Sequence, residues 1–219
     1  MNLSFMERLI DYLKQRLLVK LFVIYLRYLI GFAFIFASLV KIKGERFTLI
    51  PPTEPVGHFF EAMYQSGFYW NFLGWVQFIS GALLMSQRFS TLGAIAFFPV
   101  ILNVCLITYS VDFGSGTPMI TTLMLLGTTF LLFWDYKKWI ILFQQDHTIK
   151  LDLTKQPKDE FMTDWIWTIA GLIFVVLTLA VQIKNPTHSM TIMWLGSMLV
   201  VGVIALIIGL MRNKKRKIA

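Results

Sequence analysis

The chain of 219 residues is 57% hydrophobic and only 15% charged, which leaves too little polar surface to cover a soluble globule of this size. Its formal net charge of +8 is concentrated in particular loops and at the termini, a distribution that argues against nucleic-acid binding and favours a membrane protein. The single cysteine, Cys105, excludes an intrachain disulfide and a CxxC redox pair.

Residues 1–20 alternate apolar and charged positions, which predicts an amphipathic helix on the cytoplasmic surface. Six apolar stretches follow and predict an all-α polytopic membrane bundle, with spans at 21–40, 69–85, 91–110, 118–134, 165–183 and 191–211. We expect residues 21–134 to form a four-span core with a long outer loop at 41–68. A cytoplasmic connector at 135–164 should then lead to a two-span appendage at 165–211 and a polybasic tail at 212–219.

The distribution of basic residues predicts the orientation of these spans. Fifteen of the twenty lysine and arginine residues fall in the N-terminal segment, the turn between the second and third spans, the connector and the tail. These segments share one side of the membrane if the six spans alternate in direction. The excess predicts a multi-pass protein of the cytoplasmic (inner) membrane with both termini in the cytoplasm. The basic tail should face anionic lipid.

Arg27 lies inside the first span, and the sequence leaves two interpretations of it open. Its long side chain can snorkel to the cytoplasmic headgroups. Alternatively, Arg27 belongs to a stripe along one face of the helix that packs against other helices. The members of this stripe recur every three or four residues and are Arg27, Gly31, Phe34, Ser38 and Lys41.

Polar residues also occur in the second and third spans. Gln77 lies near the middle of the second span, on a stripe whose other members are Trp70, Gly74 and Gly81. An amide at that depth needs hydrogen-bond partners on other helices, and its simplest function is to stabilise helix packing. Asn103 shares a face of the third span with Pro99 and Ser110, for which a packing kink is the common explanation.

Taken together, the polar residues of the first four spans and their outer ends predict a polar pocket that opens outward. The candidate residues are Arg27, Lys41, Glu61, Gln77, Asn103 and Asp112. The charged groups could form a structural clasp, bind the head of a quinone or another small polar ligand, or relay protons. The three histidines are dispersed without metal-ligating spacing, so we expect no metal site and no haem.

The fifth and sixth spans carry uncharged stripes of small residues, which favour helix packing over chemistry. The stripes are Thr168, Gly171, Val175 and Thr178 in the fifth span and Gly202, Ala205 and Gly209 in the sixth.

Two segments of the core resemble the DoxX-like family of membrane proteins. They are RYLIGFAFIFASLVKI, residues 27–42, and WNFLGWVQFISGALLMSQRFSTLGAIAFFPVILN, residues 70–103, and the resemblance covers about residues 20–135. It implies a four-helix membrane bundle, with Arg27, Lys41 and Asn103 at landmark positions of the family. Gln77 departs from the glutamate that the family often has there.

Some members of that family are subunits of quinone-linked membrane oxidoreductases. The resemblance therefore implies an accessory subunit of a membrane redox system, with no intrinsic cofactor and a quinone as the expected ligand. Expected partners are the lipid bilayer, a membrane or peripheral redox subunit and further copies of the chain in a homo-oligomer. Two alternatives remain open: a subunit of a small-molecule transporter or channel, and a non-catalytic scaffold.

Overall fold

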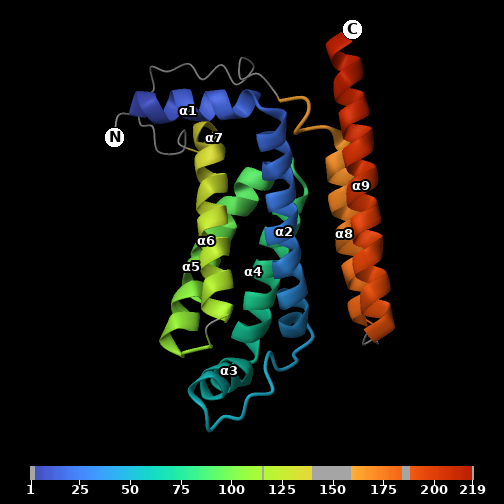
Figure 1. Ribbon diagram of the computed structural model, residues 1–219. Helices are drawn as coiled ribbons and strands as arrows, with labels where there is room; N and C mark the ends of the chain where they lie inside the picture. Colours follow the sequence, from blue (N-terminus) through green and yellow to red (C-terminus); the bar gives the residue numbers. More distant parts are fainter. Residues whose placement is uncertain (1–2, 115, 140–158, 184–187, 219) are drawn as a thin grey trace.

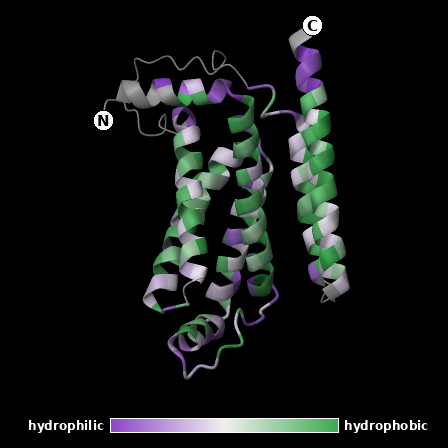
Figure 2. Ribbon diagram, viewed as in Figure 1, coloured by the Kyte–Doolittle hydropathy of each residue, from purple (hydrophilic) through white to green (hydrophobic). Residues whose placement is uncertain are grey.

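The computed structural model describes residues 3–114, 116–139, 159–183 and 188–218, and within these ranges the chain is helical without any strand (Figure 1). Five of the described helices are long and apolar enough to cross a membrane: α2 (Leu17–Ile42), α5 (Ser90–Ser110), α6 (Gly116–Trp134), α8 (Trp165–Ile183) and α9 (His188–Ile218). Apolar residues dominate the bodies of these helices, and hydrophilic residues gather at their ends (Figure 2). The prediction of an all-α polytopic membrane bundle is confirmed.

The second predicted span, α4 (Phe68–Met85), is not among these five, and it carries the polar residues Asn71, Gln77 and Ser80. It nevertheless runs from one end of the bundle to the other beside α2 and α5 (Figure 1). Since α2 ends at one end of the bundle and α5 begins at the other, α4 must traverse the same slab to connect them. Gln77 and Ser80 are buried within the bundle.

Two ends of the bundle can be distinguished. At the end that we call the α1 end, α1 (Leu3–Gln15) lies across the bundle, and α7 (Tyr136–Trp139) and the C-terminus of α9 are also found there (Figure 1). Arg16, in an extended conformation, separates α1 from α2. At the opposite end, which we call the α3 end, α3 (Pro55–Gln65) follows the first span. Most of the predicted connector, residues 140–158, lies outside the described residues.

The centre of the bundle is the contact between α2 and α4. All members of the predicted α2 stripe are buried, and so are Trp70, Gly74, Gln77 and Gly81 of α4. The two backbones touch at a pair of glycines, since a Cβ added to Gly81 would lie 2.8 Å from the carbonyl oxygen of Gly31. Glycine permits this approach because it has no side chain to separate the helices.

The α8–α9 pair packs on the core mainly through α8, and Tyr25 of α2 also donates to the carbonyl of Gly202 in α9 at 3.0 Å. The hydroxyl of Tyr28 in α2 donates a hydrogen bond to the carbonyl of Trp167, and that of Thr168 donates to the carbonyl of Ser86 at 2.8 Å. Gly171, Thr178, Gly202, Ala205 and Gly209, from the two predicted small-residue stripes, are buried. The stripes therefore serve interhelical packing, as predicted.

Candidate functional site

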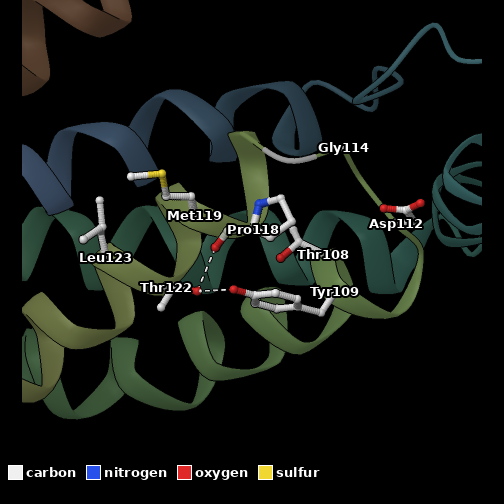
Figure 3. Close-up of a pocket in the computed structure, with 8 residues that line it drawn as sticks. All are labelled: Thr108, Tyr109, Asp112, Gly114, Pro118, Met119, Thr122 and Leu123. Carbon is white, nitrogen blue, oxygen red and sulfur yellow. Dashed lines mark hydrogen bonds between the residues drawn. The ribbon is translucent and has the colours of Figure 1, made fainter.

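A groove of about 420 Å³ opens between α5 and α6 at the α3 end of the bundle (Figure 3). It is lined by Thr108, Tyr109, Asp112, Gly114, Pro118, Met119, Thr122 and Leu123. Of the six pocket residues predicted from the sequence, it contains Asp112 alone.

The turn between α5 and α6 sets the floor of this groove. Asp112 and Gly114 both have left-handed backbone conformations, with φ of 50° and 74°. Glycine adopts this region freely and aspartate tolerates it better than most residues, which explains the local sequence. Pro118 lies in the first turn of α6, where a missing N–H costs no helical hydrogen bond. Its carbonyl oxygen accepts hydrogen bonds from the hydroxyls of Thr121 and Thr122, at 3.0 and 2.8 Å.

The hydroxyl groups of the groove use their protons inside the protein. The hydroxyl of Thr122 donates to Pro118, so the proton in its 3.0 Å contact with Tyr109 must come from the tyrosine (Figure 3). Thr108 donates to the carbonyl of Cys105 at 2.8 Å. Thr122 accepts from Tyr109 and also lies 3.6 Å from the thiol of Cys105, so the acceptors that remain available are the lone pairs of the Tyr109 oxygen and the carboxylate of Asp112. The groove therefore favours a ligand that donates hydrogen bonds.

One wall of the groove faces the surroundings of the bundle. Tyr109, Met119 and Leu123 are each more than half exposed, on helices apolar enough to span a membrane. Large apolar side chains on the outer face of such helices meet lipid chains. The groove thus combines an opening toward lipid with polar groups near the end of the spans, which suits a molecule with an apolar tail and a polar head.

Arg27 lies at the other end of the bundle, in a buried ion pair. Its guanidinium donates to Asp135 Oδ2 at 2.7 Å and to Gln87 Oε1 at 3.1 Å, and Arg27 and Asp135 are only 2% and 4% exposed. Thr91 donates to the same carboxylate oxygen at 3.0 Å, and Lys138 donates to the other at 2.7 Å. Snorkelling to the headgroups is therefore the wrong interpretation of Arg27, because a buried carboxylate neutralises its charge inside the protein.

The electrostatics of this pair favour the ionised carboxylate. Burial alone raises the pKa of Asp135, but the charges of Arg27 and Lys138 and the hydrogen bonds from Lys138 and Thr91 outweigh it. The pKa of Asp135 consequently lies below its usual value.

Lys41 is buried at the α3 end without a carboxylate partner among the described residues. Its ammonium group donates to the carbonyl of Ala37 at 3.1 Å and lies 4.6 and 5.1 Å from the ring centres of Phe47 and Trp70. These distances are typical of cation–π interactions. Glu61 instead accepts two hydrogen bonds from Arg46, at 2.8 and 3.0 Å, which lower the pKa of the glutamate. The structural clasp of charged groups, one of the interpretations that the sequence leaves open, therefore does not form between Lys41 and Glu61.

Gln77 and Asn103 do not share a pocket. Gln77 is buried, and its Oε1 has no hydrogen-bond partner among the described groups. Asn103 is exposed on α5, because Ile101 and Cys105, two positions on either side, face the interior. Two residues along a helix correspond to a rotation of about 200°, so Asn103 points away from the core. The prediction that Asn103 contributes to an interhelical pocket is wrong.

The sequence analysis did not identify Asp135 as the partner of Arg27, nor Tyr109 and Thr122 as residues of the groove between α5 and α6. Asp135 directly follows the fourth predicted span, which should end on the side of the membrane where the first span begins. Asp135 and Arg27 should therefore lie at a similar depth, and this could have identified them as partners. Tyr109 and Thr122 carry no such signal, because single hydroxyls are common in membrane helices. Their meeting depends on how α5 and α6 pack.

Comparisons with known proteins identify neither a family nor an activity. No family model and no solved structure matches the chain. A segment of 75 residues is 32% identical to a protein of Bacillus subtilis (strain 168) described as "Uncharacterized protein YwoB". The match covers 34% of this chain and 47% of that protein, so about half the length of the relative is spanned. The chain is thus similar over one third of its length to a protein whose description names no activity.

Proposed function

We propose that this chain is an integral membrane protein that binds a bilayer-resident amphiphile in the groove between α5 and α6. The expected ligand is the quinol form of a quinone, whose hydroxyl groups donate hydrogen bonds to Asp112 and to the Tyr109 oxygen, which Thr122 holds in place. The observation that carries this proposal is the combination of inward-directed hydroxyl protons with a wall open toward lipid. A quinone carbonyl, which only accepts, would find fewer partners there.

The proposal extends to an accessory subunit of a quinone-linked membrane redox system. The resemblance of residues 20–135 to the DoxX-like family supports this assignment, and the single cysteine agrees with an accessory function. The proposed partners are a membrane or peripheral redox subunit and further copies of the chain.

We place the protein in the cytoplasmic membrane with both termini in the cytoplasm. The excess of lysine and arginine in the segments assigned to that side supports this orientation. Further support comes from α1 and the C-terminus of α9, which lie at the same end of the bundle (Figure 1). The groove then opens on the outer side.

The transporter alternative is less well supported. It requires water access along the stripe from Arg27 to Lys41, but α2 packs backbone to backbone on α4 at Gly31 and Gly81 within that stripe.

A binding experiment tests the proposed ligand class. Short-chain quinol and quinone are titrated anaerobically against the full-length protein in immobilised nanodiscs. We expect the quinol to bind more tightly than the quinone. The double variant Tyr109→Phe/Thr122→Val should weaken quinol binding by about tenfold, as expected for the loss of one or two hydrogen bonds. Tyr69→Phe, which alters an exposed tyrosine of α4 outside the groove, is the matched control. Equal affinity of the double variant and the control would refute the site.

The redox assignment needs a separate measurement. Membranes from cells that lack the protein should show slower quinol-dependent electron transfer. The wild-type protein should restore the rate, and Tyr109→Phe/Thr122→Val should not. An unchanged rate in the deletion would refute the redox assignment while leaving ligand binding in place.

A further inference from the structure

A second cavity, of about 590 Å³, lies at the α1 end, where the α8–α9 pair meets the turn between α4 and α5. Its charged lining residues are Arg88, Glu160, Asp164, Arg212, Lys215 and Arg216, with Thr163 and Trp165 beside them. Four cations face two carboxylates, so the cavity carries an excess of two positive charges.

Asp164 organises the arginines on the α9 side of this cavity. Its side chain is 3% exposed, and it pairs with Arg212 at 2.7 Å and with Arg216. The backbone N–H of Ile166 also donates to Asp164 Oδ1 at 3.0 Å. Burial raises the pKa of Asp164, but this hydrogen bond and the two arginines outweigh burial and lower it. Arg216 also donates to the carbonyl oxygen of Glu160 at 2.7 Å and lies 4.0 Å from the Glu160 carboxylate. Arg212 pairs with Asp164, and since a guanidinium has five N–H donors, it keeps donors available to a ligand.

The other two cations are not neutralised by a carboxylate in the part of the chain that the structure describes. The guanidinium of Arg88 lies 4.2 Å from the centre of the Trp165 ring, and no ion pair is made by Arg88 or Lys215 among the described side chains. Stacking on the indole fixes Arg88 without consuming its hydrogen-bond donors. Arg88 and Lys215 therefore stay outside the salt bridges that Asp164 and Glu160 make with Arg212 and Arg216.

The depth of the cavity indicates where an anion would come from. Trp165 is the first residue of the spanning helix α8 and is more than half exposed. Exposed tryptophans at the ends of spans typically lie at the level of the lipid headgroups. Arg212, Lys215 and Arg216 occupy the last turns of α9, beyond its apolar part.

We propose that this cavity is a binding site for a phosphate group, held by Arg88 and Lys215 together with Arg212 and Arg216. Guanidinium groups bind phosphate oxygens through paired N–H donors, and basic pockets between spanning helices suit anionic headgroups. The phosphate of an anionic phospholipid and free inorganic phosphate share this chemistry. The site is separate from the groove between α5 and α6 and does not depend on the proposed function.

Native mass spectrometry of the full-length protein in a neutral detergent tests the site. The probes are phosphatidylglycerol, phosphatidylcholine as the zwitterionic control, and inorganic phosphate as a competitor. The test variant is Arg88→Gln/Lys215→Gln, which removes two cations that no described carboxylate pairs. The matched control, Arg8→Gln/Lys214→Gln, removes the same charge from exposed positions at the same end of the bundle that do not line the cavity. Lys214 and Lys215 are neighbours on one helix, which makes the comparison strict.

We expect one phosphatidylglycerol to bind in preference to phosphatidylcholine. Affinity should fall about fivefold for each charge removed from the cavity and about 25-fold in the double variant. The control should stay within about twofold of the wild type, since charges outside the cavity act only through screened long-range attraction. Displacement of the lipid by millimolar inorganic phosphate would support the site and assign it to free phosphate, and failure of phosphate to compete would assign it to the lipid.

Two outcomes would overturn the proposal. Equal weakening in the test and control variants would mean that binding follows net charge alone. Equal affinity for phosphatidylglycerol and phosphatidylcholine would mean that the cavity does not select an anion. If Arg88→Gln impairs folding through the loss of its contact with Trp165, the single variants Lys215→Gln and Lys214→Gln give the same comparison.

Discussion

Arg27 and Asp135 illustrate how this chain accommodates charge inside a membrane bundle. An isolated charge at this depth is costly, but the guanidinium and the carboxylate compensate each other, and Gln87, Thr91 and Lys138 satisfy further hydrogen-bonding capacity. Removing one partner of such a pair is more damaging than replacing both, because the other charge is left buried and uncompensated.

Asp135→Asn should therefore lower the free energy of unfolding by about 3–5 kcal/mol. Unfolding by SDS in mixed micelles, followed by circular dichroism, measures the change. Asp112→Asn is the matched control, because Asp112 is exposed and asparagine also tolerates its left-handed conformation. If Asp135→Asn lowered the free energy of unfolding by less than about 1 kcal/mol, the effect would match that of a solvent-exposed ion pair. This result would contradict a buried ion pair between Arg27 and Asp135.

The pH dependence of stability should report the same carboxylate. The pKa of Asp135 is lower in the folded protein than its ordinary value of 3.8, so the unfolded chain binds more protons at low pH. The stabilisation is present above pH of about 4 and is lost as the pH falls through the folded pKa. Thermal midpoints between pH 6 and pH 3 should fall more steeply for the wild type than for Asp135→Asn. Parallel curves would contradict the assignment.

The sequence predicted which residues of α2 and α4 share a face better than it predicted their partners. The stripes that helical spacing indicates in both helices are buried, although the sequence left open whether Arg27 snorkels to the headgroups. Helical spacing within one span does not identify partners on another span, so Asp135 was missed although its position after the fourth span matches the depth of Arg27. Asn103 failed for a related reason, since no pattern in α5 shows which of its faces meets the neighbouring helices.

At the scale of elements, the contact between α2 and α4 determines the geometry of the core. Gly31 and Gly81 allow the helices to approach until backbone atoms touch, and the polar stripes of both helices are buried along this line. Close packing of this kind replaces the hydrophobic effect as the driving force for association in lipid.

Gly81→Ala should destabilise the protein by about 1–3 kcal/mol, the usual cost of forcing an extra methyl group into a packed interface. The added carbon would lie 2.8 Å from the Gly31 carbonyl oxygen and 3.1 Å from Ile35 Cγ1. Gly196→Ala is the control, because nothing lies within 4 Å of that position in α9. The control should leave the free energy of unfolding unchanged or raise it by up to about 1 kcal/mol. Equal effects of the two substitutions would argue against the close contact.

The sequence predicted the helices well because length and apolar composition dominate in a bilayer. It located α4 because no charged residue interrupts this stretch, and the stripe of tryptophan, glycine and glutamine indicated the face that is buried. The groove between α5 and α6 could not be predicted, because it depends on the left-handed turn at Asp112 and Gly114 and on the resulting approach of Tyr109 to Thr122.

At the scale of the whole molecule, the proposed topology counts α4 as a sixth crossing beside the five helices that are apolar enough to span a membrane, and it therefore predicts both termini on one side. Single cysteines at Arg8, Thr53 and Lys214, introduced into a Cys105→Ala background, can be labelled with an impermeant maleimide in cells and in inverted vesicles. We expect Arg8→Cys and Lys214→Cys to react from the cytoplasmic side and Thr53→Cys from the outside. Reaction of Arg8→Cys and Lys214→Cys from opposite sides would show that α4 does not cross.

The groove between α5 and α6 at the α3 end combines hydroxyl groups with a wall that opens toward lipid near the end of the spans. This combination is the basis of the proposed function. Native mass spectrometry of the protein extracted from its own membrane, with the bound small molecule identified by fragmentation, tests this most directly. We predict one amphiphile with a hydroxyl-bearing head, a quinol, on the wild type and on Tyr69→Phe, and its loss in Tyr109→Phe/Thr122→Val. Equal retention in all three proteins, or a bound molecule without a hydrogen-bond donor in its head, would contradict the account.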